Sequence, residues 1–207
     1  KPVREIIENH FNDLGIIHRD QIGSIIVEKK GNATNPRVML AGHMDEIGFM
    51  VKYISKEGYI RFIPLGGWFD QVLLGQRVVI STIKGDIKGV IGVKPPHLLS
   101  AEERKKVVEK SEMYIDIGAV SRQEVDDAGV RVGDPITPDA KFEVLNNGKS
   151  LLSKAFDDRV GVAVMIEVLR EFQNIEHPNT IFAAATVMEE IGLRGATTTV
   201  DLVKPDI

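Results

Sequence analysis

The sequence predicts an α/β domain into which a small β-barrel domain is inserted. Two short apolar runs, 38–41 and 180–187, are typical of strands that are covered on both faces of a sheet. Between them lie several short β-type runs punctuated by glycine, a pattern that favours a small barrel. We therefore expect an α/β domain formed by residues 1–50 and 146–207, and an inserted β domain formed by residues 51–145.

The first segment of the α/β domain is expected to form a helix followed by two strands. Apolar residues recur at helical spacing within 3–13. A strand is expected from Gly23 to Glu28, and the Gly- and Asn-rich stretch 31–36 is typical of a turn. The strand at 38–41 then leads directly into the sequence Gly-His-Met-Asp.

The inserted domain is expected to consist of regularly spaced short strands. These β-type runs are 59–63, 77–83, 87–91 and 113–117. Lys84-Gly85-Asp86 joins two of them and is a hairpin signal. Only 101–109 and 122–128 have the pattern of helices within this domain.

The α/β pattern returns after Asn146-Asn147-Gly148. Asp158 is expected to cap a helix that runs to about Phe172 and buries one apolar face. The apolar strand 180–187 ends close to two consecutive glutamates, and a last helix is expected at 195–203.

Composition excludes several classes of protein. The 207 residues are 43% hydrophobic and 27% charged, which is ordinary for a soluble globular protein. A net charge of −4 gives no indication of binding to nucleic acid or to an anionic membrane. Because there is no cysteine, disulfides, thiolate metal sites and a cysteine nucleophile are excluded. With no apolar run long enough to span a bilayer and no signal peptide, we expect a cytoplasmic protein.

The two ends of the chain indicate a piece of a longer protein. The chain has no initiator methionine, and Lys1 leads directly into the first predicted helix. At the other end, Lys204-Pro205-Asp206 has the pattern of a connection into a further strand. We therefore expect the chain to be truncated at both ends.

Three segments carry metal-ligating residues at places where α/β sheets commonly hold their sites. In His43-Met44-Asp45, a neutral imidazole could bind a divalent metal while the carboxylate accepts the other ring N–H. Taken alone, this pair is as simply explained by a histidine with a local hydrogen bond. In Asp157-Asp158, one carboxylate could bridge two cations. The alternative is a helix cap beside a solvated neighbour.

The third segment is Glu189-Glu190, which follows an apolar strand. One of the two acids could bind a metal while the other takes a proton from water. The alternative is a solvated surface pair. Together the three segments supply a histidine and several carboxylates without cysteine, a ligand set that suits Zn, Co or Mn. The combination favours a metal-dependent hydrolase.

Five sequence blocks carry a resemblance to a known family. They are 38–49, 66–68, 94–97, 154–159 and 186–196. In these blocks the chain resembles the tetrahedral aminopeptidase family, which includes glutamyl and deblocking aminopeptidases and members labelled endoglucanase. The blocks occur in the family's order and span nearly the whole chain.

The resemblance implies a role for each candidate residue. His43 would bind the first metal, Asp157 would bridge both metals, and Glu190 would bind the second. Glu189 would be the general base, and Asp45 would orient His43. The cofactors implied are two divalent ions, most simply Zn or Co.

The resemblance also implies an architecture and partners. It implies a catalytic α/β domain that carries a PDZ-like β-barrel dimerisation domain, with dimers assembling into a dodecamer. Peptides would be the substrates, and neither nucleic acid nor membrane would be a partner. Two further ligands of the family, an Asp and a His, would lie beyond Ile207.

Two other functions remain open at this point. A glycosidase could use the paired carboxylates as acid and base, although it would leave His43 without a role. The absence of two of the family's metal ligands from this chain favours a non-catalytic assembly or peptide-binding module. The sequence determines neither the preferred N-terminal residue nor the metal.

Overall fold

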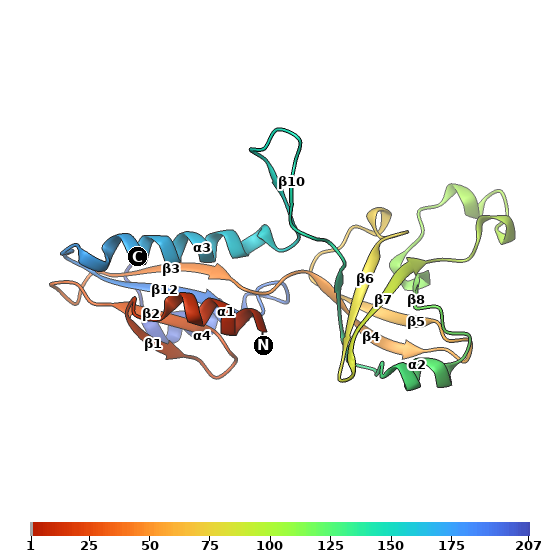
Figure 1. The fold of residues 1–207 in the computed structure, drawn as a ribbon, viewed down its shortest axis with the longest axis horizontal. Coiled ribbons are helices and arrows are strands. Elements are labelled where there is room, and N and C mark those ends of the chain that lie inside the picture. Colours follow the sequence, from red (N-terminus) through yellow and green to blue (C-terminus); the bar gives the residue numbers. More distant parts are fainter. Residues whose placement is uncertain (1) are drawn as a thin grey trace. The chain divides into compact units, whose positions relative to one another are not determined.

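The computed structural model describes residues 2–207, which form two compact units. One unit comprises the residues up to Glu46 together with Ala155–Ile207, and the other comprises Ile47–Lys154 (Figure 1). The chain therefore divides at 46/47 and 154/155, not at the positions 50/51 and 145/146 suggested by the sequence. The shift arises because the first barrel strand begins at Gly48 and a short hairpin before Lys154 groups with the barrel.

The first unit is an α/β layer built on a four-stranded sheet with the order β1-β2-β12-β3. Its strands are β1 (Ile16–Arg19), β2 (Ile25–Lys29), β3 (Arg37–His43) and β12 (Thr180–Thr186). Its helices are α1 (Pro2–Phe11), α3 (Phe156–Glu171), the short 3-10 helix η5 (Phe172–Asn174) and α4 (Arg194–Val203). Strand β12 is parallel to β3 and antiparallel to β2, which in turn is antiparallel to β1.

Strand β12 is buried on both faces, as its apolar sequence predicts. Ala183 and Ala185 belong to the core formed with α1 and α3, whereas Ala184 and Phe182 pack with Val203 of α4. The side chains alternate between the two cores because successive residues of a strand point to opposite faces. The sheet is thus covered on both sides, with its central strand leading to the candidate site.

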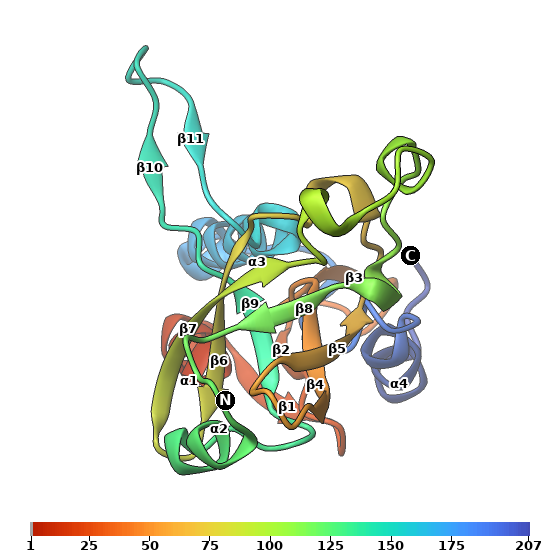
Figure 2. The same ribbon diagram turned by 90° about the vertical axis from the view of Figure 1, so that its right-hand side faces the viewer.

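The second unit is a closed barrel with the strand order β4-β5-β8-β7-β6-β9 (Figure 2). Its strands are β4 (Gly48–Ile54), β5 (Ile60–Leu65), β6 (Arg77–Thr82), β7 (Gly85–Gly92), β8 (Tyr114–Asp116) and β9 (Pro135–Pro138). Helix α2 (Arg122–Ala128) and the hairpin β10 (Glu143–Val144) with β11 (Leu151–Leu152) belong to the same unit. Short 3-10 helices lie at η1 (Asp70–Val72), η2 (Pro96–Leu98), η3 (Glu103–Lys105) and η4 (Lys110–Glu112). The predicted barrel is confirmed.

Of the two helices predicted in the barrel domain, only 122–128 is correct. Ser121 accepts a hydrogen bond from the Glu124 amide and starts that helix. At 101–109, Ser100 and Glu103 form a reciprocal capping pair, yet the chain makes only the 3-10 turn η3. The β-branched Val107 and Val108 follow this turn, and Val108 packs on the barrel core instead of continuing a helix.

No helix within residues 2–207 has the length and apolar character needed to cross a membrane.

Candidate metal centre

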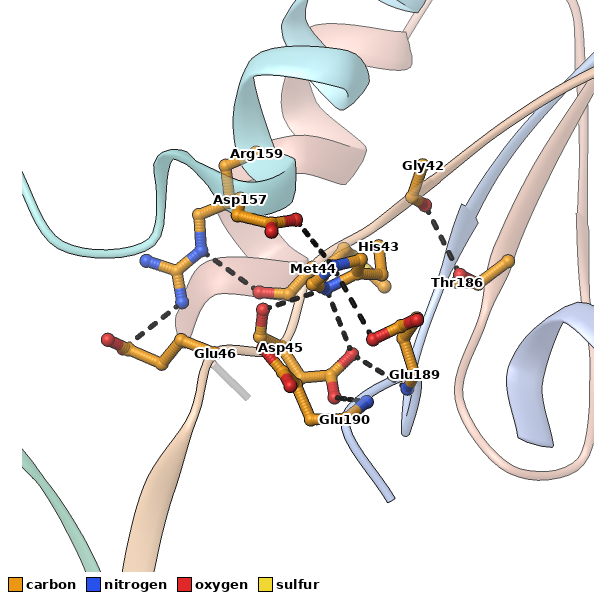
Figure 3. Close-up of polar contacts among 10 residues, drawn as sticks. All are labelled: Gly42, His43, Met44, Asp45, Glu46, Asp157, Arg159, Thr186, Glu189 and Glu190. Carbon is orange, nitrogen blue, oxygen red and sulfur yellow. Dashed lines mark hydrogen bonds and ion pairs between the residues drawn. The ribbon is translucent and has the colours of Figure 1, made fainter. Parts of the chain in front are cut away.

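The register of two parallel strands brings the first and third candidate segments together. His43, the last residue of β3, lies opposite Thr186, the last residue of β12. The register continues past the strands, because the Met44 amide donates to the Thr186 carbonyl at 2.8 Å. Parallel strands end at the same edge of a sheet, so the residues after β3 and those after β12 meet there (Figure 3).

The second segment reaches the same edge at the start of α3. Asp157 and Asp158 have non-helical backbone angles and are joined by a cis peptide bond. The Asp158 carboxylate accepts a hydrogen bond from the Gly161 amide at 3.0 Å, so the predicted cap is confirmed. A Cβ on Gly42 would lie 2.9 Å from this carboxylate, and glycine therefore lets the start of α3 approach β3.

His43 is the buried group around which the acids gather. The side of the ring that carries Nδ1 faces the Asp45 main-chain carbonyl at 3.0 Å. Since a carbonyl oxygen can only accept, Nδ1 is the protonated nitrogen of the neutral ring. Nε2 lies 3.1 Å from Asp157 Oδ1 and 3.7 Å from Glu189 Oε2. The neutral tautomer thus presents the Nε2 lone pair to the acids, which is the arrangement that a shared cation requires.

The charges around His43 alter its protonation in the absence of a cation. Burial alone would lower the pKa of His43. The hydrogen bond with Asp157 and the negative charges of Asp45 and Glu189 outweigh burial, and the pKa lies above its ordinary value of 6.5. The site therefore favours a positive charge at this ring.

Asp45 contacts more than the histidine. Its Oδ1 is 3.6 Å from His43 Nδ1, which is beyond hydrogen-bonding distance. The carboxylate instead accepts the main-chain amides of Glu189 and Glu190, each at 3.2 Å. The ring N–H is held by the Asp45 main chain, and the side chain holds the segment after β12.

The surroundings of Glu190 raise its pKa and so disfavour its charged form. Burial and then the negative charge of Glu189 raise the pKa of Glu190, His43 lowers it, and the charges of Asp45 and Asp157 raise it further, so the pKa lies above its ordinary value. Crowded carboxylates of this kind are stabilised by a bound cation.

The most compact group of ligand atoms differs slightly from the predicted set. Among residues 2–207, His43, Glu189 and Glu190 each offer one ligand atom, and these atoms lie within 4.8 Å of one another. Asp157 contacts the group only through His43, and 93% of its side chain is exposed. A divalent cation such as Zn, Co or Mn suits this set of one histidine, His43, and three acids, Asp157, Glu189 and Glu190.

Three supporting residues were not given roles from the sequence. Arg159 donates from Nε to the Met44 carbonyl at 2.9 Å and from Nη2 to Glu46 at 3.3 Å, which ties α3 to the segment after β3. Arg194 Nε bonds the Ile191 carbonyl within its own loop. The Gly195 amide donates to the Val187 carbonyl at 2.9 Å and closes the loop that carries the two glutamates. The sequence feature that could have identified Gly195 is a glycine at the start of a predicted helix, shortly after two consecutive glutamates.

The chain is similar to curated proteins along almost its whole length. FrvX of Escherichia coli (strain K12) is 42% identical over 207 residues, a match that covers 99% of this chain and 57% of FrvX. The lysyl aminopeptidase of Pyrococcus furiosus is 35% identical, with 99% of this chain and 58% of that protein covered. The chain therefore spans a little over half the length of these relatives.

Solved structures give the same result for the fold. The TET aminopeptidase of Thaumarchaeota archaeon SCGC AB-539-E09 matches with a TM-score of 0.95 and 51% identity, over 98% of this chain and 57% of that one. The dodecamer of PhTET1-12s matches with a TM-score of 0.86 and 36% identity, over 99% of this chain and 60% of that one. A structure from Thermotoga maritima named endoglucanase matches with a TM-score of 0.78 and 30% identity, over 99% of this chain and 58% of that one.

A family model also matches most of the chain. The model described as M42 glutamyl aminopeptidase matches residues 23–207, which include the whole barrel unit, most of the α/β unit and all five candidate site residues. Membership of this family implies the use of divalent metal, in agreement with the ligand group around His43. On this match and the identities above, the chain belongs to the M42 glutamyl aminopeptidase family.

Proposed function

We propose that the protein containing this chain is a metal-dependent aminopeptidase, a hydrolase that removes residues from the N-terminus of peptides. The observation that carries this proposal is the buried imidazole of His43, whose Nε2 faces carboxylates from two other segments. The names of the relatives, which include a lysyl aminopeptidase and a TET aminopeptidase, support peptides as the substrates.

In this proposal His43, Asp157 and Glu190 hold two divalent ions, most simply Zn or Co. Asp157 offers two carboxylate oxygens and would be shared by the ions, while His43 and Glu190 would each supply a further ligand. Two of the three groups are acids, which offsets the repulsion between cations about 3.5–4 Å apart. The raised pKa of Glu190 supports its place beside a cation, because its neighbours are negative.

A further ligand can come from the edge of β3. The Ile207 amide bonds the Arg37 carbonyl at 3.3 Å, and the Met39 amide bonds the Ile207 carbonyl at 2.9 Å. This is the bonding pattern of a parallel strand. The family resemblance implies two further ligands, an Asp and a His, and we propose that one of them reaches the site along this edge of β3.

Bound divalent ions would lower the pKa of a water molecule and polarise the scissile carbonyl. Glu189 accepts the proton of this water and passes it to the leaving amine, as a general base and then a general acid. Its carboxylate is well placed, because Oε2 lies 3.7 Å from His43 Nε2 and the side chain is 35% exposed. His43 keeps its orientation through the Asp45 carbonyl, and the free α-amino group of the peptide would be held near the ions.

We also propose that the protein forms a homo-oligomer through its barrel unit. The barrel contributes none of the candidate site residues, so its role must be sought elsewhere. The PhTET1-12s relative is named as a dodecamer, which supports assembly of dimers into a dodecamer here.

Glu189→Gln tests the proposed function. In the full-length protein loaded with metal, turnover of an aminoacyl-anilide should fall by at least about 10²-fold, the usual contribution of general acid–base catalysis. Metal content should stay unchanged. Glu176→Gln is the matched control, since Glu176 is an exposed acid of the same unit outside the site. Near wild-type turnover in Glu189→Gln would remove this residue from the mechanism.

A glycosidase is the competing function, since one structural relative is named endoglucanase. Its acid pair would act without metal. Hydrolysis of a polysaccharide that survives strong chelation, in a protein inactive on aminoacyl-anilides, would replace the aminopeptidase proposal by this one. Inactivity on both substrates would favour a non-catalytic assembly or peptide-binding module.

A further inference from the structure

We propose that the Asp45 carboxylate positions the Glu189–Glu190 segment by binding two consecutive main-chain amides, and thereby sets where both glutamate side chains lie relative to His43. The part of this inference that concerns catalysis rests on the proposed function. The part that concerns the main chain does not.

The geometry separates this role from that of orienting the histidine. One carboxylate oxygen accepts the Glu189 amide and the other accepts the Glu190 amide, both at 3.2 Å (Figure 3). The His43 ring is already bonded to the Asp45 carbonyl at 3.0 Å, whereas the carboxylate is 3.6 Å away. The side chain of Asp45 is therefore free to act across the sheet edge, from the end of β3 to the loop after β12.

The backbone just before these amides needs such a partner. Met188 has a φ of 58°, a left-handed conformation that is unfavourable for a residue with a side chain. Conformations of this kind persist where the surroundings hold them. Consecutive amides that point to one side form a concave donor pair, and an anion bound there stabilises the conformation. Asp45 supplies that anion from within the chain.

The consequence for the site is direct. Glu189 and Glu190 carry their side chains on the two residues whose amides Asp45 holds, and both belong to the compact ligand group with His43. Release of the amides would let this segment rotate and would move the proposed base and ligand together. An asparagine at position 45 has a single acceptor oxygen, so it can keep only one of the two bonds.

Asp45→Asn in metal-free, full-length protein tests the main-chain part. Hydrogen–deuterium exchange of a peptide covering 187–193 should become at least about tenfold faster, because charge-assisted bonds to two amides are weakened. Asp20→Asn is the matched control: the Asp20 carboxylate also accepts consecutive main-chain amides, those of Ile22, Gly23 and Ser24. That variant should speed exchange around 21–25 and leave 187–193 unchanged.

Unchanged exchange of 187–193 in Asp45→Asn would overturn the proposal. An equal rise there in both variants would also overturn it, since the effect would then be a general loss of stability. Amide exchange in the wild-type protein tests the proposal without any variant. Its Glu189 and Glu190 amides should be protected in the metal-free state, and exchange at the rate of exposed amides would contradict the inference.

A kinetic arm addresses catalysis with metal at saturation. Asp45→Asn should lower kcat by at least about tenfold with KM changed by less than about twofold, since the base is displaced while the peptide still binds. A rise in KM with kcat unchanged would overturn the catalytic part. If the wild-type protein hydrolyses no peptide, the proposed function fails, and the exchange experiment still decides the role of Asp45.

Discussion

Gly195→Ala should destabilise the α/β unit, because the backbone leaves no room for a side chain at this position. A Cβ on Gly195 would lie 2.3 Å from the Val187 carbonyl oxygen and 2.6 Å from the Val187 amide nitrogen. Both are main-chain atoms and cannot turn aside as a side chain would. This close approach of the two backbone segments also allows the Gly195 amide to donate a hydrogen bond to the Val187 carbonyl at 2.9 Å.

The expected cost follows from three terms. Overpacking costs about 1–3 kcal/mol, and loss of the hydrogen bond costs about 0.5–1.5 kcal/mol. Alanine gains up to about 1 kcal/mol over glycine as a helix former, and less in the first turn of α4. The free energy of unfolding of the α/β unit should therefore fall by about 2 kcal/mol.

Urea unfolding followed by far-UV circular dichroism measures this change. Among these 207 residues Trp68 is the only tryptophan and lies in the barrel, so in this chain its fluorescence should keep its wild-type midpoint in Gly195→Ala. Gly67→Ala is the matched control, since a Cβ there meets nothing within 4 Å. If Gly195→Ala unfolds at the wild-type urea concentration, the close contact between α4 and the end of β12 is wrong.

Three further predictions follow from the site and the units. Metal affinity should fall as the pH drops from about 8 to about 5, because protons compete with the metal for His43 and then for Glu190, and the pKa of each is raised. A zinc titration at several pH values measures this change. An affinity that does not vary with pH would contradict the prediction. Burial raises the pKa of Asp20, but hydrogen bonds with Thr198, Ser24 and Gly23 outweigh it and hold the pKa below 3.8. Its stabilisation is therefore present above pH 3.8 and lost as the pH falls further, so acid unfolding should be steeper in wild type than in Asp20→Asn, and parallel curves would refute this. Replacement of 47–154 by a Gly/Ser linker should reduce the oligomer to smaller species in light scattering, and an unchanged mass would place the interface elsewhere.

Local patterns were sufficient to predict the elements that position the site. The apolar run at 180–187 correctly predicted a strand buried on both faces, β12, whereas most of β3 is only half-buried and Ala41 is exposed. The ends of both runs correctly marked the segments that carry His43 and Glu189. The glycine-punctuated runs gave the barrel, because strand and turn signals depend on neighbouring residues.

What the sequence did not give depends on contacts between distant residues. Strand β1 is short and half exposed, and it forms by pairing with β2, so its own residues carry a weak signal. Asp45 was expected to bond to the His43 ring, but the parallel register of β3 and β12 brings it to amides far along the chain.

The metal content of the full-length protein tests the central proposal most directly. Elemental analysis after saturation and desalting should give about two divalent ions per subunit in the wild-type protein, as a two-metal site requires. Glu176→Gln should retain this content, and Glu190→Gln should lose at least one ion, because it removes a charged ligand beside His43. A Glu190→Gln protein that keeps the full wild-type metal content and affinity would show that the metals are held by other residues.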